Sequence, residues 1–185
     1  TTGYMLLTLA ETLLLKLGGL SLFDSFIHAL STVSTGGFSS YNDGIMHFDS
    51  LYVRIIILIF MIICGMSFTT FYSATRRGLK VFREDTEVKA YFTIMLIAVF
   101  IVFAGVYFIE TGWSHRGEAV NSAFQVVSIL TTTGFVSDDL SLWPAFCQMV
   151  LILLMIIGGC SSSSSSGNKV IRLVVVFKLM LHGIP

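Results

Sequence analysis

Charged residues are scarce in this chain of 185 amino acids, and their scarcity argues against an ordinary soluble domain. Asp, Glu, Lys and Arg make up 12% of the sequence, whereas hydrophobic residues make up 55%. Typical globular chains carry roughly a quarter charged residues. The formal net charge is zero, so nothing in the composition indicates nucleic-acid binding.

The residue patterns of metal sites and catalytic sites are also missing. Cys64, Cys147 and Cys160 form no C-x-x-C pair, and their apolar or small neighbours predict buried, reduced thiols. The four histidines show no metal-ligand spacing, and no nucleophile–base set is present. We therefore predict that the protein is not an enzyme and holds no cofactor. The start also lacks Met and a basic leader, so we interpret the chain as a segment of a longer protein.

Two long apolar stretches are present instead. Residues 51–75 contain only Arg54, and residues 88–109 contain only Lys89, each charge standing near one end. Both stretches exceed the roughly 20 apolar residues that a helix needs to cross a bilayer. The sequence therefore predicts an all-α integral membrane protein that crosses the plasma (inner) membrane several times.

The charged residues divide by sign along the chain. Acidic residues occupy the loops at 41–50 and 136–144, which contain no Lys or Arg. Basic residues gather between the two apolar stretches and near the C-terminal end: Arg76, Arg77, Lys80, Arg83 and Lys89, then Lys169, Arg172 and Lys178. By the positive-inside rule the basic connection is cytoplasmic and the acidic loops face outward. Lys16, Arg54 and Arg116 depart from this division, and we place each at a membrane end.

An internal repeat organises the chain. Residues 31–39 align with residues 128–136 at an offset of 97, and residues 61–65 align with residues 155–159 at an offset of 94. We divide the chain into one unit at 1–80, whose first crossing is clipped, and a second unit at 81–185. Each unit contains a crossing, a short helix, a Ser/Thr/Gly motif, an acidic loop and a second crossing.

The short helices, at about 21–33 and 116–130, are too short to span a bilayer and too apolar for a surface element. Short helices and polar backbone persist at membrane depth only where they are buried in protein or line water. Each unit therefore predicts a re-entrant pore hairpin.

The motifs after the short helices suit a desolvated cation. Stacked backbone carbonyls replace the water of the ion without adding charge that would trap it. Glycine permits the backbone conformations that turn successive carbonyls to one axis, and the C-terminal ends of the short helices carry partial negative charge. An aromatic residue after the glycine can wedge the strand against neighbouring helices. The predicted ion-binding residues are Thr35, Gly36, Gly37, Phe38, Thr132, Thr133, Gly134 and Phe135.

These motifs resemble the Trk/Ktr/HKT superfamily of potassium transporters, most closely its bacterial TrkH-like uptake subunits. The resemblance rests on Phe23-Asp24, residues 31–39 and 128–135, and Gly158-Gly159-Cys160 leading to residues 169–172. It implies four crossing–pore–crossing repeats around one pore, each with one filter glycine that the family conserves. The matching glycines in this chain are Gly37 and Gly134. The chain then holds the second and third repeats. Two strands cannot complete a fourfold filter, so the isolated chain is not expected to conduct.

The resemblance implies partners as well. It implies a homodimer in membrane lipid and a cytosolic nucleotide-binding regulatory subunit, which could dock near residues 76–89 or 169–178. Gly at both visible filter positions favours potassium within this family. Potassium over sodium stays open, because two of the four strands are not in this chain.

The last crossing is interrupted. Residues 144–157 give roughly 21 Å of helix, short of a ~30 Å hydrocarbon core. A run poor in helix formers follows before apolar residues resume at Val170, so we predict a broken helix, a feature that often marks a transport site. In the resembled family this stretch is an intramembrane loop that obstructs the pore, although its uniform serines depart from the family pattern. The predicted gate loop is Gly158, Gly159, Cys160, Ser161, Ser162, Ser163, Ser164, Ser165, Ser166, Gly167 and Asn168.

We therefore expect potassium translocation, with dehydration at the filter carbonyls and gating at the broken helix. Two alternatives stay open on the sequence. The protein could carry a small organic solute at the broken helix, in which case that solute and not rubidium would block flux. It could also be a non-conducting assembly subunit, in which case filter substitutions would change no flux.

Overall fold

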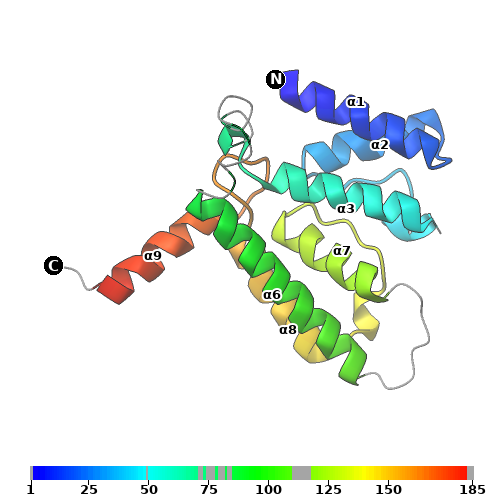
Figure 1. Ribbon diagram of the computed structural model, residues 1–185. Helices are drawn as coiled ribbons and strands as arrows, with labels where there is room; N and C mark the ends of the chain where they lie inside the picture. Colours follow the sequence, from blue (N-terminus) through cyan, green and yellow to red (C-terminus); the bar gives the residue numbers. More distant parts are fainter. Residues whose placement is uncertain are drawn as a thin grey trace.

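The computed structural model describes residues 2–48, 50–70, 73, 78, 82, 85–109 and 118–182. Regular structure within these residues is helical throughout, without a strand, as the sequence predicted (Figure 1). Of the basic residues used for the topology, Arg76, Arg77, Lys80, Arg83 and Arg116 lie outside the described residues.

The first half of the chain contains α1 (Thr2–Leu17), α2 (Leu22–Val33), the 3-10 turn η1 (Gly44–His47) and α3 (Leu51–Gly65). Ser21 caps α2, because its hydroxyl accepts the Asp24 amide at 3.0 Å. The α1, α2 and α3 helices pack on one another, with α2 against both longer helices.

The second half contains α6 (Thr86–Ile109), α7 (Glu118–Leu130), η2 (Leu140–Leu142), α8 (Ala145–Ile157) and α9 (Val170–His182). The α6, α7 and α8 helices again pack on one another, and α7 also contacts α3, which joins the two halves. Figure 1 shows α9 projecting away from the other helices.

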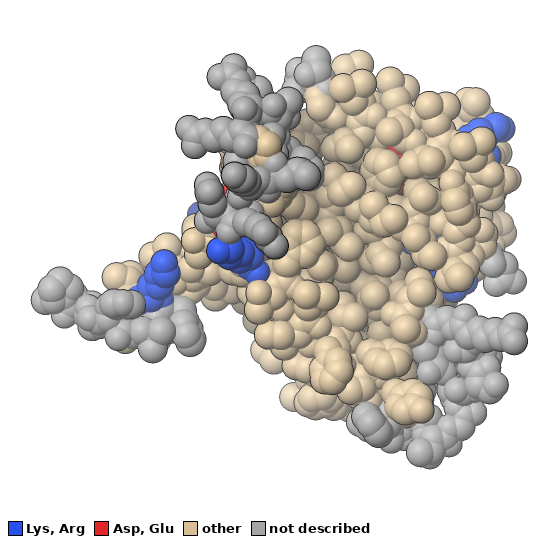
Figure 2. Space-filling model, viewed as in Figure 1, with Lys and Arg blue, Asp and Glu red and all other residues tan. Residues whose placement is uncertain are grey.

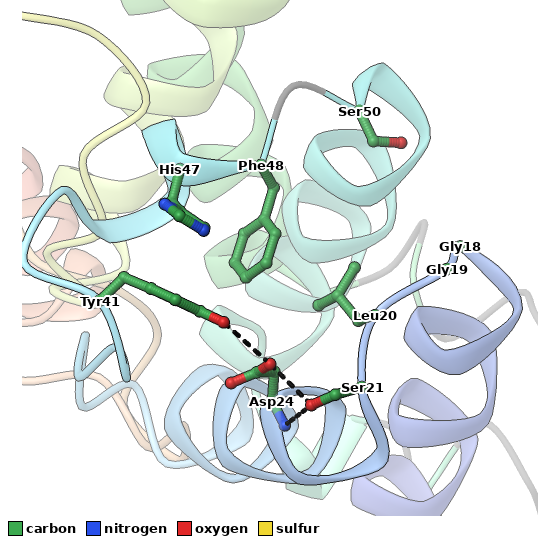
Figure 3. Close-up of a pocket in the computed structure, with 9 residues that line it drawn as sticks. All are labelled: Gly18, Gly19, Leu20, Ser21, Asp24, Tyr41, His47, Phe48 and Ser50. Carbon is green, nitrogen blue, oxygen red and sulfur yellow. Dashed lines mark hydrogen bonds between the residues drawn. The ribbon is translucent and has the colours of Figure 1, made fainter.

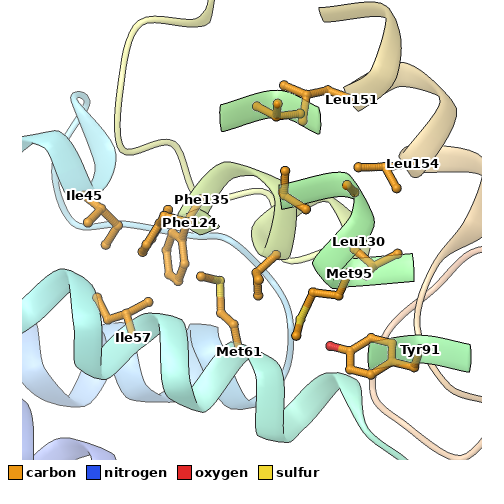
Figure 4. Close-up of a cluster of buried hydrophobic side chains, with 14 of the residues drawn as sticks. Ile45, Ile57, Met61, Tyr91, Met95, Phe124, Leu130, Phe135, Leu151 and Leu154 are labelled. Atoms are coloured by element: carbon orange, nitrogen blue, oxygen red, sulfur yellow. The ribbon is translucent and has the colours of Figure 1, made fainter. Parts of the chain in front are cut away.

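A single apolar core joins the two halves (Figure 4). Ile57 and Met61 of α3 meet Phe124 and Leu130 of α7, and each of these side chains is fully buried. Residues from α6 and α8 extend the core, among them Tyr91, Met95, Leu151 and Leu154. The interface between α3 and α7 is therefore the centre of the chain.

The outer faces of α1, α6 and α8 expose large apolar side chains. Met5, Phe100 and Met149, from α1, α6 and α8, are 66%, 72% and 66% exposed. Figure 2 shows a face whose middle is largely uncharged, with Lys and Arg toward its edges. By length and composition one described helix could cross a membrane, over the 22 residues Thr86–Tyr107. Four other apolar helices, α2, α3, α7 and α8, are shorter.

One predicted helix boundary differs in the structure and another agrees. The apolar stretch 51–75 does not form one helix, because α3 ends at Gly65. The Gly65 carbonyl accepts the Cys160 amide at 3.1 Å, a tertiary contact in place of a bond to the next helical turn, and a Cβ at Gly65 would lie 2.6 Å from both Thr131 and Tyr91. The predicted break in the last crossing is confirmed, between α8 and α9. The three cysteines are buried and free, also as predicted.

Candidate filter and gate loop

The two short helices end in the same way. After α2, the amides of Thr35 and Gly36 donate to the carbonyls of Thr32 and Ser31 at 3.0 and 2.8 Å. After α7, the amides of Thr132 and Thr133 donate to the carbonyls of Ile129 and Ser128 at 3.0 and 2.9 Å. This pair of bonds is the Schellman motif, which closes a helix with one left-handed residue. That residue is a threonine in both halves.

Left-handed backbone is rare for a threonine, and here it occurs twice at the 97-residue offset. Thr35 has φ 53° and Thr132 has φ 56°. Two residues later, Gly37 and Gly134 have φ 70° and 83°. Each motif therefore turns at the threonine and again at the glycine, which is a conformation that a Cβ atom resists.

The two predicted filter segments lie against each other. A Cβ built on Gly37 would stand 2.0 Å from the carbonyl oxygen of Thr133, so only glycine fits there. A Cβ on Gly134 would meet nothing within 4 Å, so at that position φ alone favours glycine. The structure therefore brings residues 35–38 and 132–135 together, although they stand far apart in the sequence.

The aromatic residues of the two motifs differ. Phe135 is 2% exposed and lies 6.1 Å from the ring of His28 on α2, so it wedges its strand between the two halves. Phe38 is 77% exposed and therefore does not wedge its strand against the described helices, contrary to the sequence expectation for an aromatic residue at this position. The difference arises because residue 135 faces the junction of the two halves and residue 38 faces outward.

Polar side chains of α2 hold the segment that follows Phe38. His28 Nε2 lies 3.0 Å from the hydroxyl of Ser39, and the other ring nitrogen lies 2.8 Å from the Asp24 carbonyl. Asp24 accepts hydrogen bonds from Ser40 at 2.8 Å and Tyr41 at 3.2 Å. These bonds anchor the end of the strand to the helix that precedes it.

Asp24 lies at the edge of a cavity of about 410 Å³ (Figure 3). Gly18, Gly19, Leu20, Ser21, Tyr41, His47, Phe48 and Ser50 also line it. The Ser21, Ser40 and Tyr41 hydroxyls all donate to the Asp24 carboxylate. The hydrogen bonds from Ser21 and then Ser40 hold the pKa of Asp24 below its usual value.

In the second half the filter segment is held by hydroxyls at the end of α7 and just after it. Ser128 donates to the carbonyl of Phe135 at 2.7 Å, and the hydroxyls of Thr131 and Thr133 are 2.8 Å apart. Ser128 and Thr131 are fully buried, so these bonds replace the water that their polar atoms would otherwise bind.

The predicted gate loop contacts both motifs at equivalent positions. The Thr35 hydroxyl donates to the carbonyl of Ser164 at 3.1 Å and shares its hydrogen with the carbonyl of Ser34 at 2.7 Å. The amide of Ser166 donates to the Thr132 hydroxyl at 2.7 Å. The two left-handed threonines therefore bind the loop on one side, while their backbone continues into the predicted filter.

The base of the loop is narrow. A Cβ on Gly158 would lie 2.2 Å from the Ser166 carbonyl oxygen, and Gly158 and Gly167 have φ 73° and 91°. Lys169 is the third position of this region with positive φ, at 65°, and its ammonium group donates to the Ser165 carbonyl. None of the six consecutive serines in the described loop has positive φ, so the uniform serine run fits this backbone without strain.

Glu87 is the residue of this region that sequence reasoning missed. It lies in the first turn of α6, is 7% exposed and accepts hydrogen bonds from the amide and hydroxyl of Ser161 at 2.5 and 2.9 Å. An acidic residue at the start of a helix is explained by the helix dipole alone, so the sequence carries no signal for this contact.

Comparison with known proteins places the chain in a family. The TrkH family model, described as "Cation transport protein", matches residues 5–184. The chain is 37% identical over 177 residues to the Trk system potassium uptake protein TrkH of Escherichia coli K12, covering 95% of this chain and 36% of that protein. It is 31% identical over 182 residues to the Trk system potassium uptake protein TrkG of the same organism, covering 98% of this chain and 37% of that protein.

The fold agrees with a solved structure. The crystal structure of the potassium transporter TrkH from Vibrio parahaemolyticus superposes with a TM-score of 0.90 at 29% identity, covering 98% of this chain and 42% of that one. The chain thus spans a little over a third of the length of the curated relatives it matches. These relatives are named as transporters, not as enzymes. The chain belongs to the TrkH family of cation transport proteins.

Proposed function

We propose that this chain forms part of a potassium-transport pore in the plasma (inner) membrane, with residues 35–38 and 132–135 as two strands of a carbonyl filter. One observation carries the proposal. Two glycine-containing segments, each preceded by a left-handed threonine, lie against each other where two short helices end. Such helix ends carry partial negative charge, and successive carbonyls can replace the hydration shell of a monovalent cation.

The proposed gate is the loop at residues 158–168. Its attachment to Thr35 and Thr132 supports a position directly beneath the filter strands. A loop held there would obstruct ion passage, and conduction would require it to move. The relatives are named as potassium uptake proteins, which supports potassium as the transported ion.

The proposal concerns the whole protein, because the two strands described here cannot surround an ion. A homodimer and a cytosolic nucleotide-binding regulatory subunit belong to the proposal too, with the regulator near residues 76–89 or 169–178. Half of residues 76–89 lie outside the described part of the chain, whereas Arg172 and Lys178 are exposed on α9.

The test is potassium-dependent growth of an uptake-deficient bacterium that carries the full-length gene. We expect the wild type to restore growth at low potassium and Gly134→Asp, expressed at a normal level, to fail. Gly19→Asp is the matched control, because Gly19 also has positive φ and open space around its Cβ position but lies in the turn between α1 and α2. We expect this control to restore growth.

Growth on Gly134→Asp equal to the wild type would refute the filter assignment. Block of flux by a small organic solute and not by rubidium would instead favour a solute carrier that uses the broken helix. Normal flux in all filter variants would favour an assembly subunit.

A further inference from the structure

A buried carboxylate connects the proposed gate loop to the start of α6. Glu87 points both oxygens at Ser161, one accepting the backbone amide and the other the hydroxyl, at 2.5 and 2.9 Å. The side chain is 7% exposed, so water competes little for these bonds. Hydrogen bonds to an ionised acceptor are roughly twice as strong as neutral ones.

Glu87 in turn connects to the segment between the two halves. Its backbone amide donates to Asp85 Oδ1 at 2.9 Å, and the Thr70 hydroxyl donates to Asp85 Oδ2 at 2.6 Å. Thr70 follows α3, so a chain of hydrogen bonds runs from the end of the first half to Ser161. The carbonyl of Ser162 also accepts the amide of Phe68, in the same segment.

The loop is therefore held from two directions. Thr35 and Thr132 bind residues 164 and 166 on the filter side. Glu87 binds residue 161 on the side of the inter-repeat connection. The filter-side bonds are made by neutral threonine hydroxyls, whereas the bond on the other side is made by a carboxylate in the first turn of a helix, where the dipole favours negative charge.

We propose that Glu87 is a positioning residue that holds the gate loop in its obstructing position and couples that position to Thr70 and Asp85. The inference rests on the proposed function, because it takes residues 158–168 to be the gate. Replacing the carboxylate by a neutral amide leaves Ser161 with neutral hydrogen bonds in place of charge-assisted ones, which removes stabilisation from the obstructing position and shifts the loop toward positions that leave the filter open. A shift of Thr70 and Asp85 moves Glu87 with them and releases Ser161 in the same way.

The experiment is rubidium flux into proteoliposomes that contain the full-length protein without any added regulatory subunit. We expect Glu87→Gln to raise this flux about tenfold, because a neutral group replaces the ionised acceptor of the Ser161 hydrogen bonds and weakens them. Ser161→Ala removes only the hydroxyl bond and should raise flux about threefold. Glu87→Asp keeps the charge but shortens the reach, and should resemble Glu87→Gln.

A double variant distinguishes a positioning role of Glu87 from a general loss of protein stability. If Glu87 acts through Ser161, then Glu87→Gln with Ser161→Ala raises flux by less than the product of the two single effects, which is about thirtyfold. Asp139→Asn is the matched control, because Asp139 also accepts the amide and hydroxyl of one serine, Ser141, at 2.9 and 2.7 Å but in an exposed loop. Its flux should equal that of the wild type.

Two results would overturn the inference. Unchanged flux in Glu87→Gln with normal protein yield would show that the contact does not hold the gate. Lower flux together with a lower unfolding temperature would show that Glu87 supports only the fold. The double variant Glu87→Gln, Gly134→Asp tests the proposed filter separately from the role of Glu87. Flux that persists in this double variant would refute the filter assignment, whatever the flux of Glu87→Gln alone.

Discussion

The contact between Gly37 and Thr133 gives the sharpest prediction about the filter. In Gly37→Ala the new Cβ would lie 2.0 Å from the Thr133 carbonyl oxygen, whereas real Cβ atoms essentially never approach closer than 3.0 Å. The two strands must therefore separate by about 1 Å (3.0 minus 2.0) or more. Binding geometry generally tolerates displacements of about 0.5 Å, so this shift is too large for an ion site.

Backbone conformation adds to the effect. Gly37 has φ 70°, and a residue with a Cβ in the left-handed region costs about 1–2 kcal/mol. Because a misplacement of about 1 Å can reduce a rate a hundredfold, we expect rubidium flux through full-length Gly37→Ala to fall by about ten- to a hundredfold. Flux is measured in proteoliposomes, with protein yield and unfolding temperature recorded for each variant.

Gly36→Ala is the control, one residue away in the same strand. Its Cβ would meet the Phe38 ring and the Ser34 hydroxyl at 3.2 Å, and both are side chains that can move. We expect its flux to stay within about twofold of the wild type, as for substitutions that create no buried defect. Equal flux in Gly37→Ala and wild type, or equal loss in the two alanine variants, would refute the argument from strand contact.

Two further predictions concern the ends of the strands. Thr132→Val removes the hydroxyl that accepts the Ser166 amide at 2.7 Å. We therefore expect rubidium flux without the regulatory subunit to rise about fivefold, as for one lost neutral hydrogen bond, whereas Thr132→Ser keeps the wild-type flux. Reduced flux in Thr132→Val would contradict this prediction. Asp24 has its folded-state pKa lowered by the Ser21 and Ser40 hydroxyls, so its stabilising effect is present above the unfolded pKa and is lost as pH falls through the folded value. The difference in unfolding temperature between wild type and Asp24→Asn should therefore be largest near neutral pH and shrink below about pH 4, the ordinary aspartate range; a difference that is constant from pH 7 to pH 3 would contradict it.

The helices and their order could be predicted from the sequence, because they depend on local composition. Residues 88–109 are apolar enough to predict the 24-residue helix α6, and the glycine and serine run at 158–168 predicts the break before α9. The end of α3 could not be predicted in this way. Half of residues 66–75 are still hydrophobic, yet the helix ends at Gly65, whose carbonyl accepts the amide of Cys160 from a distant part of the chain.

Some features of the candidate site could likewise be predicted from the sequence, and others depend on the tertiary structure. The motifs at residues 35–38 and 132–135 could be selected from the sequence, since a threonine and a glycine recur at one offset and their backbone needs are local. The glycine requirement at Gly37, by contrast, comes mainly from a carbonyl of the other motif. The exposure of Phe38 and Phe135 also depends on the tertiary structure. These identical residues at equivalent positions are 77% and 2% exposed, because only Phe135 faces the junction of the two halves.

Glu87 shows most clearly what could not be predicted from the sequence. By itself, the sequence determined a membrane protein with two similar units, two candidate filter segments and an interrupted helix, because hydrophobicity and glycine content act over a few residues. Only the tertiary structure decided that the two segments touch and that Glu87 binds Ser161, 74 residues later in the chain. A contact over that separation depends on how the helices pack, and no local pattern of residues specifies it.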